Sequence, residues 1–187
     1  VDAIIGPTWM DTFGGATHLA DEYKTVMITP SAIITAIKKE KNYNYVFSTY
    51  WRTDEAIQVL VEHYAKTGKK KISLFYENDA FWEEIAEHLK RYSKEKGIEI
   101  IMEQKFNYEE TDFRTPLVKS KEQKPDLIFL GVTGGKSRLA FLKQRQELYP
   151  QSVVYSTESI SELAKNKKYK YLMEGVYFIT PKDTDVE

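Results

Sequence analysis

The fold is decided by residues 69–84, KKKISLFYENDAFWEE, which combine a strand, a polar turn and the start of a helix. The apolar run at 72–75 follows three lysines, a pattern typical of a strand that helices cover on both faces. Asp79 carries the side-chain oxygen that caps free N–H groups at the start of a helix. Ligands of open parallel sheets bind beyond the carboxyl ends of the strands, so we expect residues 77–82 to face a binding crevice.

The composition indicates a globular chain without a strong charge. The chain has 187 residues, and 42% of them are hydrophobic, which is enough to bury a core. Its 27 basic and 28 acidic residues give a net charge of -1, so nucleic acid is not an expected partner. The absence of cysteine excludes disulfides, thiolate catalysis and thiolate metal ligands. No apolar run reaches the roughly 20 residues that span a bilayer.

Strands alternate with helices along the chain, which predicts an α/β fold of the doubly wound type with parallel sheets. Besides the strand and helix of residues 69–84, the expected strands are 2–6, 25–29, 45–48, 98–106, 126–131, 153–156 and 175–180, and the expected helices are 11–23, 54–66, 112–123, 136–148 and 161–165. Residues 31–44 are expected to form a loop. From residue 53 to 181 we expect one parallel sheet with helices on both faces.

Residues 42–53, NYNYVFSTYWRT, differ from both neighbouring segments. They combine aromatic and hydroxyl side chains with an arginine, and no helical period runs through them. We interpret them as a crossover between two lobes. An aromatic edge strand that packs on a helix is the alternative.

Residues 131–137, GVTGGKS, resemble a phosphate-binding loop because they follow a strand and open a helix. That loop needs four residues between its first glycine and the Gly-Lys-Ser or Gly-Lys-Thr end, because the ring size aims the backbone N–H groups at the phosphates. Leu130 stands at the required glycine position, and Gly131 leaves one residue too few. We therefore do not expect nucleotide hydrolysis, and interpret the glycines as a turn that lets a ligand approach the backbone.

No other group of residues requires catalysis. His18, His63 and His88 lie on separate expected helices without a partner four residues on, which does not match a histidine metal site. The carboxylates of residues 77–84 could polarise a ligand or hold a hard cation, but capping of the helix explains them more simply. No serine stands in a nucleophile elbow. We expect a protein that is not an enzyme and that carries no cofactor or metal.

Six motifs occur in register with those of type I periplasmic solute-binding proteins: AIIGP at 3–7, VMITPSA at 26–32, YVF at 45–47, KKISLFYEND at 70–79, TDF at 111–113 and KPDLIF at 124–129. The chain resembles this family, the branched-chain amino acid binders of ABC importers and the related ligand-binding regions of receptors. The resemblance runs from Val1 to about Pro181 without large gaps.

The resemblance implies two doubly wound lobes that close on a ligand about a hinge. It assigns residues 1–50 to a partial N-terminal lobe, 51–181 to a C-terminal lobe and 182–187 to the start of a crossover back to the first lobe. We therefore expect a fragment that lacks both ends of the family fold. Apolar faces left uncovered in the first lobe are expected to pair with a second copy, as a homodimer.

The resemblance also places candidate binding residues in the first lobe. Relatives that bind amino acids direct a serine hydroxyl at the ligand carboxylate, and this position falls at Met10, between Trp9 and Asp11, so the hydroxyl is lost. The turn after the second strand lacks the threonine of those relatives and contributes Ser31, Ala32 and Ile33.

The opposite wall is expected to come from the second lobe. Phe81 fills the place of a family aromatic, Trp82 stands where glycine is common, and Thr133 lies on the same wall. Glu158 matches the carboxylate that receives a ligand ammonium group, with a solvated loop carboxylate as the alternative. Tyr50 and Trp51 are also expected near the cleft, and with Trp9 and Trp82 they favour an aromatic or planar ligand.

The resemblance implies an extracytoplasmic solute-binding protein of an ABC importer, which holds a small polar or amino-acid-like molecule between its lobes. Lobe closure would present the loaded protein to a membrane permease. The expected location is the periplasm or the extracellular space, with a lipid anchor as an option for the full-length protein. The alternative function is a ligand-binding sensory domain of a receptor or regulator.

Overall fold

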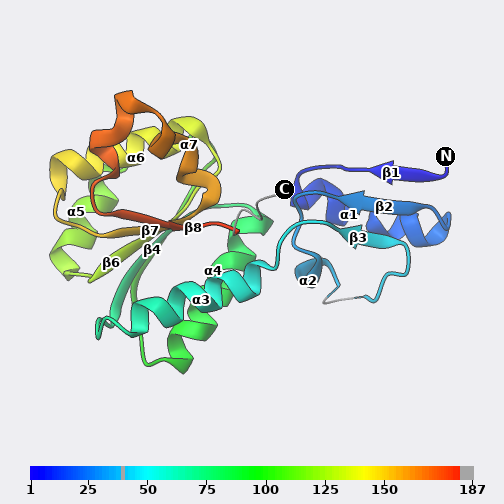
Figure 1. The fold of residues 1–187 in the computed structure, drawn as a ribbon, viewed down its shortest axis with the longest axis horizontal. Coiled ribbons are helices and arrows are strands. Elements are labelled where there is room, and N and C mark those ends of the chain that lie inside the picture. The colour runs from blue at the N-terminus through cyan, green and yellow to red at the C-terminus, as the bar shows by residue number, and fades with distance from the viewer. Residues whose placement is uncertain (39–40, 182–187) are drawn as a thin grey trace, which may run out of the picture.

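The computed structural model describes residues 1–38 and 41–181, which form two parallel β-sheets (Figure 1). Residues 182–187, the expected start of a crossover, lie outside the described part of the chain. The smaller sheet has the order β1-β2-β3, with strands β1 (Ala3–Ile5), β2 (Val26–Thr29) and β3 (Val46–Ser48). The larger sheet has the order β5-β4-β6-β7-β8, with strands β4 (Lys71–Glu77), β5 (Glu99–Phe106), β6 (Leu127–Gly131), β7 (Val154–Thr157) and β8 (Val176–Ile179).

All strand pairs in both sheets are parallel, which confirms the predicted fold class. We call residues 1–48 the first lobe and residues 53–181 the second lobe. The described helices are α1 (Met10–Glu22), α2 (Ile34–Ile37), α3 (Thr53–Ala65), α4 (Ala80–Glu95), α5 (Arg114–Gln123), α6 (Gly135–Leu148) and α7 (Ser161–Lys165), with short 3-10 helices at Glu158–Ile160 and Lys167–Met173. Within the described part of the chain, no helix combines the length and the apolar character needed to cross a membrane.

Helices cover both faces of the larger sheet, with α3 and α4 on one side and α5 and α6 on the other (Figure 1). The interior strand β4 is buried from Ile72 to Glu77. Ile72, Leu74 and Tyr76 join the hydrophobic core beneath α3 and α4. Phe75 packs on the opposite side, where its ring lies 5.4 Å from that of Phe141. The apolar run of the sequence therefore forms a strand covered on both faces, as predicted.

The first lobe is smaller and more exposed. Its core contains Phe13 and Ala20 of α1, which pack with Met27 of β2. The edge strand β1 exposes 84% of Ile5. Pairing of this lobe with another copy of the chain stays a prediction.

Two segments of the first lobe differ from the sequence expectation or refine it. The expected loop at 31–44 contains the helical turn α2, because Ile34 and Ile37 pack against the first-lobe core. In the aromatic segment at 42–53, β3 is an edge strand of the small sheet, and residues 49–52 then lead into α3. The edge-strand interpretation thus describes residues 46–48, and the crossover interpretation describes residues 49–52.

Candidate ligand-binding cleft

The second lobe presents two neighbouring strand ends, those of β4 and β6. Strand β4 pairs with β5 on one side and with β6 on the other, so the connections after β4 and β6 run to opposite faces of the sheet. Such a switch point is where open α/β sheets leave a crevice for ligands. The turn at 78–79 and the turn at 132–134 both begin there.

Glu77, the last residue of β4, is directed at the turn that opens α6. Its carboxylate accepts hydrogen bonds from the amide of Thr133 at 2.9 Å and that of Gly134 at 2.8 Å. Burial raises the pKa of Glu77, and the two amide donors oppose that shift. A Cβ atom on Gly134 would stand 2.8 Å from Glu77 Oε1, so only glycine leaves room for the carboxylate.

This contact corrects our interpretation of the GVTGGKS turn as a place for a ligand to approach the backbone. The group that approaches is the carboxylate of Glu77, a residue of the same chain. A phosphate would have to displace a buried negative charge from the same amide groups, which contradicts nucleotide binding in this conformation.

The start of α4 forms the adjacent part of the wall. Asp79 caps this helix, as predicted, and its Oδ1 accepts a hydrogen bond from the amide of Trp82 at 2.8 Å. Trp82 is buried, and its Nε1 donates to Thr133 Oγ1 at 2.8 Å. Its ring lies against Gly131, where an added Cβ would stand 2.5 Å from Trp82 Cε3. The Phe81 ring contacts that of Trp82 edge to face, with centroids 5.2 Å apart.

Glu158 follows β7 directly and reaches the segment between the lobes. The Tyr50 hydroxyl donates to Glu158 Oε1 at 2.7 Å. Burial, followed by the negative charge of Glu158, raises the pKa of Tyr50, so its hydroxyl stays a neutral donor. Glu158 Oε2 is buried and has no hydrogen-bond partner among the described residues. A buried carboxylate oxygen without a partner is costly unless a ligand supplies one.

The first lobe contributes the turns that follow β1 and β2. Thr29 Oγ1 accepts from the amides of Ser31 at 3.3 Å and Ala32 at 3.2 Å. The Ser31 hydroxyl donates to the carbonyl oxygen of Thr8, so the two turns are tied together. Trp9 precedes α1, and its ring meets that of Tyr108 of the second lobe edge to face, with centroids 6.1 Å apart.

These walls enclose a cleft of about 250 Å³ between the two lobes. Its lining comes from the strand-end turns of both sheets and from the segment between them: Thr8, Trp9, Met10, Ser31, Tyr50, Asp79, Phe81, Trp82, Thr133, Thr157, Glu158 and Ser159.

The match to known families agrees with this arrangement. Residues 1–185 match the family model described as periplasmic binding protein. The chain belongs to the periplasmic binding protein family. No relative was found among curated proteins.

Solved structures of type I periplasmic binding proteins share the fold. A solute-binding protein of an ABC transporter from R. palustris, in complex with benzoate, has a TM-score of 0.76 at 19% identity, over 86% of this chain and 44% of that protein. A leucine-binding protein from Thermotoga maritima has a TM-score of 0.76 at 18% identity, over 88% of this chain and 47% of that protein. An ABC transporter substrate-binding protein from Desulfitobacterium hafniense has a TM-score of 0.72 at 21% identity, over 100% of this chain and 54% of that protein. The present chain thus spans about half the length of these periplasmic binding proteins.

Most of the residues that the sequence indicated border this one cleft of the binding protein: Trp9, Met10, Ser31, Phe81, Trp82, Thr133 and Glu158. The structure does not bring the others to it. Asp11 is exposed in the first turn of α1. Ala32 and Ile33 are buried in the hydrophobic cores, and Trp51 lies beside Tyr50 outside the lining.

Three lining residues were missing from the predicted residues: Thr8, Thr157 and Ser159. Tyr50 and Asp79 also line the cleft. Tyr50 was expected near it, and Asp79 falls within the expected range 77–82. Thr157 and Ser159 flank Glu158, so a wider window around the carboxylate would have included them. The described residues contain no group of three or more His, Cys, Asp and Glu side chains arranged to hold a metal ion.

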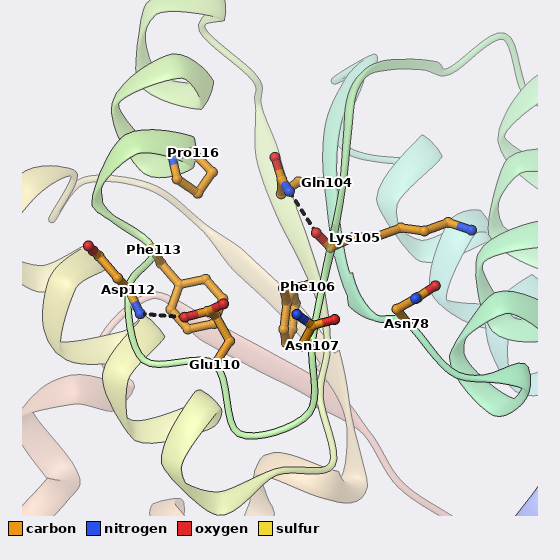
Figure 2. Close-up of a pocket in the computed structure, with 9 residues that line it drawn as sticks. All are labelled: Asn78, Gln104, Lys105, Phe106, Asn107, Glu110, Asp112, Phe113 and Pro116. Carbon is orange, nitrogen blue, oxygen red and sulfur yellow. Dashed lines mark hydrogen bonds between the residues drawn. The ribbon is translucent and has the colours of Figure 1, made fainter.

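A second hollow of about 350 Å³ lies at the end of the edge strand β5 and is lined by residues of the second lobe alone (Figure 2). Glu110 Oε1 accepts there from the amide of Asp112 at 3.1 Å, and Gln104 Nε2 donates to the Lys105 carbonyl at 2.6 Å. Each of these polar groups thus has a hydrogen-bond partner one or two residues away in the chain. The smaller cleft has walls from the strand ends of both sheets and a buried carboxylate oxygen without a hydrogen-bond partner among the described residues, so it is the better candidate.

Proposed function

We propose that this chain forms a substantial part of the ligand site of a solute-binding protein that serves an ABC importer. The supporting observation is the cleft itself, which lies at the strand ends of both sheets and holds Glu158 with one unpaired, buried oxygen. Its role is binding and not catalysis. The related proteins of known structure include binders of benzoate and of leucine, so both aromatic and amino-acid-like ligands occur on this fold.

The proposed ligand is a small molecule with a positively charged nitrogen, for which Glu158 serves as the counter-ion. The aromatic side chains around the carboxylate, Trp9, Tyr50, Phe81 and Trp82, would cover the apolar part of the molecule. Ligand contacts with both walls would favour the closed arrangement of the lobes. The closed lobes would then dock on a membrane permease outside the cytoplasm, with a lipid anchor holding the full-length protein near the membrane. No observation favours the sensory alternative.

Native mass spectrometry of the full-length protein tests this function. We expect a bound small molecule that survives gentle desorption and is released when the protein is unfolded in organic solvent. Thermal unfolding should then shift to higher temperature when the released molecule is added back, because a ligand that binds only the folded state stabilises it. A full-length protein that carries no small molecule and gains no stability from cell extract would contradict the proposal.

A further inference from the structure

The buried polar side-chain atoms that line the cleft have hydrogen-bond partners within the described part of the chain, with one exception. The Ser31 hydroxyl donates to Thr8, and Asp79 accepts from the Trp82 amide. Thr133 Oγ1 accepts from the Trp82 indole. The exception is Glu158 Oε2, which is buried without a partner among the described residues. The cleft thus offers a ligand one unpaired carboxylate oxygen.

Two turns that could receive a ligand carboxylate are already occupied by oxygens of the chain. Thr29 Oγ1 accepts hydrogen bonds from the amides of Ser31 and Ala32 on the first-lobe wall. The Glu77 carboxylate accepts hydrogen bonds from the amides of Thr133 and Gly134 on the second-lobe wall. Amides at such turns are the usual anion donors of a protein, and here the chain's own oxygens fill them.

The charges around the cleft also disfavour an anion. The described lining residues include the carboxylates of Asp79 and Glu158 but no lysine, arginine or histidine. Arg138 is close behind the wall, where it donates to the Thr133 carbonyl at 2.9 Å and lies 3.7 Å from Glu162. It is not part of the lining. A carboxylate in the cleft would therefore face two like charges.

The aromatic lining suits a cation with few N–H groups. Phe81 contacts both Tyr50 and Trp82 edge to face, with centroids 5.8 Å and 5.2 Å apart. Ring faces attract cations, and this attraction is strongest where water is excluded. A primary ammonium group has three N–H donors that need hydrogen-bond acceptors, and one free carboxylate oxygen cannot accept from all three. An alkylated ammonium group has one N–H or none, and its carbon atoms can pack on the rings.

We propose that the cleft binds an organic cation with an alkylated nitrogen, an apolar body and no carboxylate. This inference rests on the proposed function, that the cleft holds a small molecule, and it narrows the ligand class. Benzoate and leucine, the ligands of two proteins with the same fold, both carry a carboxylate. The present chain is therefore expected to have a different specificity on the shared fold.

Calorimetric titration of the full-length protein, after removal of any co-purified molecule, tests the ligand class. The probes are benzyltrimethylammonium, benzylamine, benzyl alcohol, benzoate and leucine. We expect benzyltrimethylammonium to bind at least about tenfold more tightly than benzyl alcohol, a ratio within the range of cation–ring attraction. It should also bind more tightly than benzylamine, whose ammonium group has three N–H donors to place. Benzoate and leucine are expected to show no binding.

The variant Glu158→Gln tests whether the probe binds in the cleft, beside Glu158. It should weaken binding of benzyltrimethylammonium by roughly ten- to a hundredfold, because the attraction between two opposite charges at close range is lost, and leave binding of benzyl alcohol unchanged. Binding of benzoate or leucine in preference to the cations would overturn the ligand class and leave the proposed function standing. Equal affinity of benzyltrimethylammonium for wild type and Glu158→Gln would also overturn the proposed ligand class. The proposed function itself fails only in the separate search for a co-purified molecule.

Discussion

The Tyr50 hydroxyl donates a 2.7 Å hydrogen bond to Glu158, a residue 108 positions later in the chain. Tyr50 belongs to the segment that connects β3 with α3, and Glu158 directly follows the strand β7. One hydrogen bond thus joins the connection between the lobes to the carboxylate of the cleft. A change of the lobe arrangement that moves Tyr50 would alter the environment of the proposed counter-ion.

The variant Tyr50→Phe should lower the free energy of unfolding by about 1.5–3 kcal/mol, because the hydrogen bond has a charged acceptor. Urea unfolding followed by circular dichroism measures the change. The control is Tyr108→Phe, which removes an exposed hydroxyl from a residue whose ring contacts Trp9 of the first lobe. Equal stability of Tyr50→Phe and wild type would show that the bond is absent in solution.

The variant Glu77→Gln should be destabilised by about 1–3 kcal/mol, since an amide can accept from only one of the two N–H groups and leaves the other unpaired. The matched control is Glu99→Gln, at an exposed position of the edge strand β5. Hydrogen exchange of the Thr133 and Gly134 amides gives a local measure, and both should exchange faster in Glu77→Gln. If their protection stayed the same, the carboxylate would not hold this turn.

The variant Gly131→Ala should cost about 1–3 kcal/mol, because the new methyl group would overlap the Trp82 ring. The cost should shrink in a Trp82→Phe background, where the ring is smaller, so a double-mutant cycle should give a clear coupling energy. Gly135→Ala is the control, since a Cβ at that position meets nothing within 4 Å. Additive effects of Gly131→Ala and Trp82→Phe would show that the two residues do not touch.

The pH dependence of stability should include a contribution from Asp79. Burial raises the pKa of Asp79, and the amide of Trp82 opposes the shift. A raised pKa means that the folded state binds more protons than the unfolded state above the ordinary value of about 4, so stability falls as the pH rises through that window. Asp79→Asn keeps the cap and removes the titration.

The wild type should therefore lose stability relative to Asp79→Asn between pH 3 and pH 7, which urea unfolding at a series of pH values would measure. The charge of Asp79 also raises the pKa of Glu77. Asp79→Asn removes this effect, so the titration of Glu77 changes the difference in the same direction. A difference in unfolding free energy that is constant with pH, or that moves in favour of the wild type, would contradict the burial of a charged Asp79.

The sheet of the second lobe could be predicted because its strands carry their signal locally. The apolar run at 72–75 and the cap at Asp79 lie within one short stretch, and burial on both faces leaves few other structures for such a run. The short helix α2 was missed because four residues are too few to show a helical period.

The hydrogen bonds of the cleft could not be predicted in the same way. Glu77 meets the amides of Thr133 and Gly134 only because β4 and β6 are neighbours in the sheet, although these residues are 56 and 57 positions apart in the chain. A threonine that captures the amides of Ser31 and Ala32 likewise has no distinct sequence pattern. The residues around the cleft could be predicted because they follow the ends of strands. Their hydrogen-bond partners could be identified only from the three-dimensional structure.

The most direct measurement is a calorimetric titration of the molecule that co-purifies with the full-length protein, into wild type, Glu158→Gln and Glu99→Gln. Glu158→Gln should bind roughly ten- to a hundredfold more weakly, because the ligand loses a charged hydrogen-bond partner worth about 1.5–3 kcal/mol. Glu99→Gln, on an edge strand away from the cleft, should bind like wild type. Equal affinities for all three proteins would remove Glu158 from the site, and with it the cationic ligand.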